Sequence, residues 1–248
     1  MLRLEIPPFT SLHRRCPTLP PFILLSRACA TRQGCGKSKL SVLYAATIEG
    51  DADTVADILA GTKLSPNWMV VDTKNTLLHL AAINNRHKVI TTLIEAGANP
   101  NLRNIDGHTP LMCAAQRGAA HAAKALLRGE AKGSKRAQYN NTALHLAAKK
   151  GRADCVAMLV DGGCKMNVHG QNGYTPLLTA VQKGHAETVE VLLEKGANYK
   201  QTNAYGQDAI SLARQSNEAT LAVVQLFIEQ QEAQKALSTS EPSEDWGQ

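Results

Sequence analysis

Apolar and polar positions along the chain form a block of about 33 residues that recurs between residues 40 and 230. In the block from Thr175 to Gly206, a capping threonine precedes a short Leu- and Ala-containing run, which ends at Gly184. A second run follows with apolar residues three and four apart, and it ends at Gly196. This spacing predicts two amphipathic helices per block. An extended stretch with a turn at its tip then leads to the next block.

Two markers keep the same register along the chain, which indicates internal repetition. The first marker is a helix-capping residue at Thr76, Thr109, Thr142, Thr175 and Asp208. The second stands nine residues later, at Asn85, Gly118, Gly151, Gly184 and Asn217. Threonine and aspartate accept a hydrogen bond from the first helical turn, and glycine or asparagine suits a helix end with positive φ.

The stretch after each second helix carries strong hairpin-turn sequences, such as Asp106-Gly107 and Asn172-Gly173. One unit therefore reads as helix, turn, helix and β-hairpin. A single unit cannot bury its apolar side, so several must stack. We expect a repeat domain over 40–230, a basic segment over 1–39 and an acidic disordered tail over 231–248. The six predicted units open at Ser41, Thr76, Thr109, Thr142, Thr175 and Asp208.

Two of these openings carry a recognisable motif. The runs Thr76 to Ala82 and Thr142 to Ala148 match the pattern Thr-Pro-Leu-His-x-Ala except at the proline, whereas Thr109-Pro110 and Thr175-Pro176 keep the proline and lose the histidine. Over roughly 40–230 the chain resembles the ankyrin-repeat family. The resemblance implies an all-α dominated repeat solenoid of stacked helix-turn-helix units with β-hairpins. It also implies that His79 and His145 join hydrogen bonds that tie each helix start to neighbouring units.

Composition supports this view and constrains the environment. Aromatic residues make up 4% of the chain, and the formal net charge is +6. Cys113, Cys155 and Cys164 stand where other units place apolar residues, which predicts buried free thiols and a reducing compartment. No apolar run approaches the ~20 residues that span a bilayer. We therefore expect a cytoplasmic or nuclear protein, monomeric and without a membrane span.

The N-terminal segment 1–39 leaves alternatives open. It contains seven Lys or Arg residues and one acid, Glu5, which suits a basic tail or a mitochondrial targeting segment. Its prolines argue against a targeting helix, and the apolar core Phe22 to Leu25 is short for a secretory signal. The run Gly34 to Ser38 resembles a phosphate loop, but Thr31 occupies the position of the required first glycine.

No catalytic or metal-binding pattern is present in the sequence, so we expect no enzymatic activity, metal or cofactor. Function is then expected on the surface. By the family resemblance, the hairpin tips and the exposed side of each first helix form a concave binding face. On it we place the partner-binding candidates Asp106, His108, Arg117, Tyr139, Lys149, Lys150, Tyr174, Lys183 and Tyr205.

The charges suggest what this face binds. From Arg103 to Arg152 there are ten Lys or Arg residues and two acids. We expect a scaffold or adaptor that grips an acidic or extended segment of another protein, with tyrosines as anchors. Nucleic-acid or polyphosphate binding by the same basic stripe is the alternative, although stacking aromatics are sparse. A solvated face without a partner is the third reading.

The third unit is expected to be the weakest joint of the stack. Its second helix, 119–127, is rich in alanine, and Gly133-Ser134 replaces the asparagine-containing segments of neighbouring units. Fewer methylene groups are buried there, at about 0.8 kcal/mol per CH₂.

Overall fold

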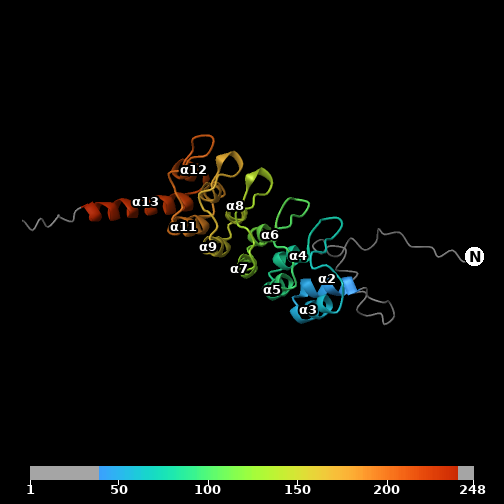
Figure 1. Cartoon of the computed structure of the whole chain (residues 1–248). Coiled ribbons are helices and arrows are strands. Elements are labelled where there is room, and N and C mark those ends of the chain that lie inside the picture. The colour runs from blue at the N-terminus through green and yellow to red at the C-terminus, as the bar shows by residue number, and fades with distance from the viewer. Residues whose placement is uncertain (1–38, 240–248) are drawn as a thin grey trace, which may run out of the picture. The chain divides into compact units, whose positions relative to one another are not determined.

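The computed structural model describes residues 39–239, drawn in colour in Figure 1. The chain divides into two compact units, 1–45 and 46–248, with the boundary inside helix α2 (Lys39–Glu49). Of the first unit, only the start of α2 is described. The segment 1–38, with the targeting and phosphate-loop alternatives, and the end of the acidic tail, 240–248, lie outside the described residues.

The second unit is a stack of antiparallel helix pairs, in which each first helix packs beside the first helix of the next pair and each second helix beside the next second helix. Helix α3 (Ala52–Ala60) follows α2 and packs against α5. The pairs after it are α4 (Leu77–Ile83) with α5 (His87–Glu95), α6 (Pro110–Arg117) with α7 (Ala120–Arg128), α8 (Ala143–Lys149) with α9 (Ala153–Asp161), α10 (Pro176–Gln182) with α11 (Ala186–Glu194), and α12 (Ala209–Ser216) with α13 (Glu218–Thr239). This architecture confirms the predicted helical repeat solenoid.

The predicted capping residues precede the first helices. The Thr109 hydroxyl accepts from the backbone N–H of Met112 at 3.4 Å, and Thr175 accepts from Leu178 at 3.2 Å. The Asp208 carboxylate accepts from the Ser211 N–H at 2.8 Å. These contacts fix where each unit starts.

Ser41 does not follow this rule. Helix α2 begins at Lys39, so Ser41 lies inside the first turn and does not cap the helix. A serine in a stretch of helix-forming neighbours can be absorbed into the helix, because its capping preference is worth only about 1 kcal/mol. The prediction that Ser41 caps the first helix was therefore wrong.

Most predicted helix-ending residues have the expected left-handed backbone. Gly118, Gly151 and Gly184 have φ between +65° and +77°, and Asn85 has φ +56°. Asn217 differs: its φ is −151°, and it caps the following helix by accepting from the Thr220 N–H at 2.8 Å. The prediction of a positive φ at Asn217 was wrong because its side chain serves the next helix instead.

Helices α5, α9 and α11 end in the same way, at a glycine, whereas α7 of the third unit does not. Gly97, Gly163 and Gly196 have φ between +81° and +88°. At the equivalent position the third unit has Glu130, which also adopts a positive φ, +61°. A Cβ atom is unfavourable in this conformation because it approaches the following carbonyl oxygen. This unit therefore carries local backbone strain that its neighbours relieve with glycine.

Alanine and leucine make up most of the core, with valine, isoleucine, methionine and cysteine at the remaining positions. The Ala-Ala pairs at the centre of α4, α6 and α8 are fully buried, which lets neighbouring helices approach closely. Cys113, Cys155 and Cys164 are buried free thiols, as predicted. Among the described residues, no helix is both long enough and apolar enough to cross a membrane.

The connecting loops are turns and not two-stranded ladders. Each tip is closed by one backbone hydrogen bond across its base, for example from the Asn104 N–H to the His108 carbonyl at 2.9 Å. Other backbone groups pair with the neighbouring loop, as in Ala204 N–H to the Asn172 carbonyl at 2.9 Å. Within residues 39–239 the strand-type pairing consists of one isolated bridge, Met69 to Thr76. The β-hairpins of the expected unit are thus reduced to hairpin-shaped turns.

The two motif histidines connect successive units. The backbone N–H of Thr76 donates to Nδ1 of His79 at 3.1 Å. Nε2 of His79 then donates to the carbonyl of His108 in the next unit at 3.0 Å. His145 repeats the arrangement with Thr142 and with the Tyr174 carbonyl, at 3.2 and 3.1 Å. This geometry agrees with the role that the family resemblance implied.

Asparagine side chains form a second set of ties between units, in which an Oδ1 atom accepts a backbone N–H of the next loop. They join Asn67 to Asn99, Asn101 to Lys132, and Asn167 to Asn198, at 2.7, 2.9 and 3.0 Å. In the third unit the equivalent residue is Ser134, and within the part of the chain that the structure describes its side chain makes no such bond. The series of asparagine hydrogen bonds between units is therefore interrupted at the third unit, which the sequence predicts to be the weakest part of the stack.

Candidate functional site

The nine predicted partner-binding residues fall into three groups that differ in exposure. Asp106, Tyr139 and Tyr205 occupy the same position on three loop tips, with Asn172 between the two tyrosines. All three are exposed, and both tyrosine side chains are 67% exposed. We call this line of loop residues, together with Val71 and Ile105, the tip row.

Arg117, Lys150 and Lys183 form the second group, and Lys149 precedes Lys150. They are exposed at the C-terminal ends of α6, α8 and α10 and recur every 33 residues. We call Arg117, Lys150 and Lys183 the cation row. The ion pair found among residues 39–239 joins Lys195 to Asp161 at 2.7 Å, away from this row. The positive charges of the row are therefore available to a ligand.

His108 and Tyr174 form the third group, and they are partly buried at the base of their loops. Their carbonyls receive the hydrogen bonds from His79 and His145. The Tyr174 hydroxyl also accepts from Nε2 of Gln182 at 3.1 Å. Both residues therefore help to hold the loops in place, in addition to any contact with a partner.

Side-chain contacts show that the loop bases and the ends of the first helices share one face. The Tyr174–Gln182 bond joins them in one unit, and Gln207 Nε2 donates to Gln215 Oε1 at 3.3 Å in the next. Lys149 has the same register as Gln182 and Gln215. Figure 1 shows the loops on the side of the first helices and α5, α7, α9 and α11 on the other side. These bonds join the loop bases to the ends of α10 and α12, and Lys183 of the cation row directly follows Gln182.

Two exposed apolar residues of the tip row, Val71 and Ile105, were not among the residues predicted from the sequence. Val71 is 87% exposed and Ile105 is 61% exposed, each on a loop. Of the six large apolar side chains exposed in the described chain, five lie on these loops and one, Leu226, lies on α13. An apolar residue inside a turn-forming, polar stretch is the sequence feature that could have indicated them.

The interior offers no reactive group. Burial raises the pKa of Cys113 to about 12 and that of Cys155 to about 12, so both remain protonated thiols. Burial lowers the pKa of His79 and His145 to about 4, which keeps both rings neutral. Within the described residues no group of three potential metal ligands is close enough to hold an ion.

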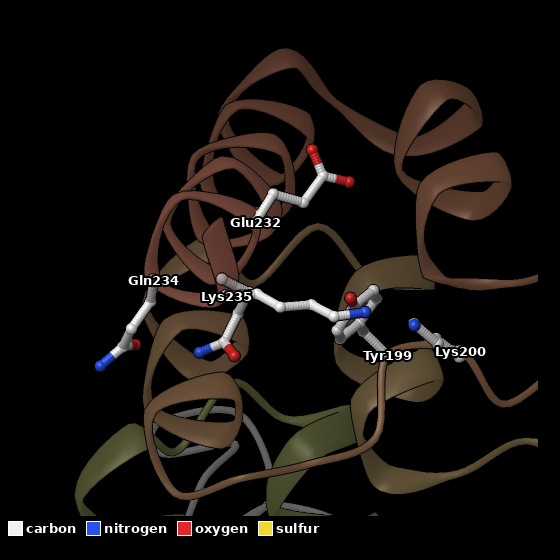
Figure 2. A pocket seen from close by; sticks show the side chains of 6 residues that line it. Tyr199, Lys200, Glu232, Gln234 and Lys235 are labelled. Carbon is white, nitrogen blue, oxygen red and sulfur yellow. The ribbon is translucent and has the colours of Figure 1, made fainter. Parts of the chain in front are cut away.

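A pocket of about 500 Å³ lies where α13 passes the loop after α11, and Figure 2 shows the side chains that line it. Tyr199 packs edge-on against Phe227, with ring centroids 6.1 Å apart, and Lys200 Nζ is 5.6 Å from the Tyr199 ring centroid. Glu232 and Lys235 lie on the α13 side. None of the nine predicted residues lines it. Its long polar side chains point in different directions, which does not suit a small-molecule site.

These features define a repeat protein whose exposed loops and helix ends, and not an interior cavity, are suited to recognition. A family model described as "Ankyrin repeats (3 copies)" matches residues 93–169 and 159–238, and one described as "Ankyrin repeat" matches 73–105. The chain belongs to the ankyrin-repeat family. Ankyrin repeats generally mediate protein–protein interaction, and the fold is typically non-enzymatic.

Similarity to curated proteins is confined to a short stretch. The chain is 32% identical over 85 residues to the E3 ubiquitin-protein ligase XBAT32 of Arabidopsis thaliana, which covers 34% of this chain and 16% of that protein. It is 33% identical over 85 residues to the probable E3 ubiquitin-protein ligase XBOS32 of Oryza sativa subsp. japonica, covering 34% and 17%. The chain thus spans less than a fifth of the length of these two relatives.

Proposed function

We propose that this protein is a non-enzymatic scaffold or adaptor that binds an acidic, extended segment of a partner protein. The segment would lie on the face formed by the loop tips and the first helices. The observation that carries the proposal is the cation row, which recurs on three consecutive units and forms no ion pair with any acid of the described residues. Family membership supports a protein as the ligand class.

The two rows supply complementary kinds of interaction. Exposed tyrosines such as Tyr139 and Tyr205 offer large contact areas at low conformational cost and are common binding anchors. Lysine and arginine side chains guide an acidic segment toward the face and suppress binding of basic ones. The salt bridges alone would contribute little, because exposed pairs are worth about 0.2–1 kcal/mol each. The apolar contacts of the tip row are needed for affinity.

Affinity capture from lysate, run in parallel with and without nuclease treatment, tests the proposal. The bait is the full chain, compared with Lys149→Glu/Lys150→Glu. A matched control, Lys88→Glu/Lys124→Glu, makes the same charge change at exposed positions on second helices. We expect a discrete protein partner that is lost with the first variant and retained with the control. Capture of nucleic acid would instead support the polyphosphate alternative, and equal capture by both variants would contradict the proposed face.

We further propose that the protein works in the cytoplasm or nucleus, with mitochondrial targeting by residues 1–39 as the alternative. The buried free thiols among the described residues suit a reducing compartment. Imaging of the full chain with a C-terminal fluorescent tag distinguishes the two, since this tag leaves the N-terminal segment unaltered. Co-localisation with a mitochondrial marker would overturn the proposal.

A further inference from the structure

The spacing of the cation row limits the conformation of a ligand that can use all of it. Arg117, Lys150 and Lys183 stand at the ends of α6, α8 and α10, and these helices pack side by side. Packed helices lie about 8–10 Å apart. Successive positive charges therefore recur at steps of about 9 Å along the face.

Ligand conformations differ in how closely they match this step. A polyproline II segment has three residues per turn and a rise of about 3.1 Å, so every third side chain returns to the same side after about 9 Å. A β-strand returns after two residues, at about 6.8 Å. An α-helix reaches a similar spacing only after two turns, at about 10.5 Å. Among short segments, only the polyproline II form presents one side chain to each unit.

We propose that the partner segment binds in a polyproline II-like conformation, with acidic side chains at every third residue facing Arg117, Lys150 and Lys183. The inference rests on the proposed function and specifies its ligand. Within residues 39–239 none of these three cations forms an ion pair, so we infer that carboxylates of the ligand supply the charge complementarity. Seven ligand residues span the row, whereas a helix would need about 15 and would first have to fold.

The tip row supports the same conformation. A polyproline II segment has three sides, so a second line of its side chains can face the loops while the acids face the cation row. Tyr139 and Tyr205 are exposed there. Aromatic side chains are the usual docking surfaces for proline-containing segments of this form. We therefore expect proline or apolar residues between the acids.

A random peptide display library of about 12 residues, long enough for four polyproline II turns, tests the inference. The full chain is the bait, with Lys150→Ala as the variant and Lys124→Ala, on the second helix α7, as the matched control. Sequencing of the selected peptides gives the separation between acidic positions. We expect acidic residues three positions apart to be more frequent than in the unselected library. This enrichment should be smaller with Lys150→Ala and unchanged with Lys124→Ala.

A second measurement uses two synthetic peptides of identical composition. The first has glutamates at positions i, i+3 and i+6, and the second has them at i, i+2 and i+4. Fluorescence anisotropy should show at least about fivefold tighter binding for the first, and this difference should vanish for Lys150→Ala. Acid-rich selected peptides with a separation of two, four or seven would overturn the polyproline II inference alone. Selection without acidic residues, or identical selection by Lys149→Glu/Lys150→Glu, would overturn the proposed function itself.

Discussion

The histidine ties make the stack sensitive to mild acid. His79 and His145 accept a hydrogen bond at Nδ1 from a capping threonine and donate from Nε2 to a carbonyl of the next unit. Protonation of Nδ1 would remove the acceptor and place a charge in the core. Burial accordingly lowers the pKa of both rings to about 4 from the ordinary value of 6.5.

The direction of the pH effect follows from proton binding. Because the folded pKa is depressed, the unfolded chain binds more protons between pH 6.5 and about 4. Stability is therefore complete above pH 6.5 and falls as the pH drops through this window. The difference amounts to roughly 3 kcal/mol for each histidine at the lower end and about 2 kcal/mol near pH 5.

Two carboxylates also have shifted pKa values, but they change protonation at lower pH than the histidines. Their effect on stability can therefore be separated from that of the histidines. Hydrogen bonds from the Thr54 side chain and the Ser211 backbone lower the pKa of Asp51 and Asp208 below 3.8. Their contribution is present above pH 3.8 and is lost only as the pH falls further. Loss of stability between pH 6.5 and about 4 therefore reports on the histidines.

Urea unfolding followed by circular dichroism, between about pH 8 and pH 4.5, measures the effect. The variant His79→Met/His145→Met uses the residue that the third unit already has at this position, Met112. We expect this variant to be less stable than wild type near pH 8, because two interunit bonds are lost, yet to lose less stability toward acid. Parallel pH profiles for the two proteins would refute the reasoning.

Three further predictions concern the third unit. Ser134→Asn should restore the missing tie and raise the free energy of unfolding by about 1 kcal/mol, whereas Asn167→Ser should lower it by a similar amount; urea unfolding that moves in the same direction for both would contradict this. Glu130→Gly should stabilise by about 0.5 kcal/mol through relief of its positive φ, and Gly97→Ala should destabilise by about 1 kcal/mol, because its added Cβ meets open space and only the backbone conformation opposes it. Hydrogen exchange should be fastest, among the interunit loops, between α7 and α8; slowest exchange there would show that this joint is not the weakest.

The period of the stack could be predicted from sequence because each marker has a local cause. Threonine at a helix start and glycine at a helix end satisfy backbone requirements that depend on few neighbours. The motif around His79 also carried an interunit contact, since the histidine returns with the period of the fold. Features with such short-range causes can be predicted from the sequence alone.

Predictions failed where one residue could serve two roles. Ser41 was assigned as a cap but lies within α2. Asn217 follows the end of α12 as assigned, but it lacks the expected positive φ and its side chain caps α13. The structure also continues α13 to Thr239, past the predicted boundary at 230. The segment after 230 contains Glu, Gln, Ala and Lys and neither Gly nor Pro until after that point, so helix propensity extends the last helix. Helix α13 therefore includes residues 231–239 of the segment that was expected to be a disordered tail.

The candidate face was only partly predictable. Register places Arg117, Lys150 and Lys183 in one row from sequence, because the repeat length is constant. Val71 and Ile105 are apolar residues in polar, turn-forming stretches, which indicates exposure, but how far each loop extends from the stack depends on the neighbouring units. The binding role of all nine candidate residues stays a prediction.

Hydrogen exchange of the full chain, with and without a peptide selected from the display library, tests the central claim most directly. The account predicts slower exchange in the loops that carry Asp106, Tyr139 and Tyr205 and at the ends of α6, α8 and α10, with α5, α7, α9 and α11 unchanged. Protection confined to the second helices would contradict it and place the binding surface on the opposite side of the stack.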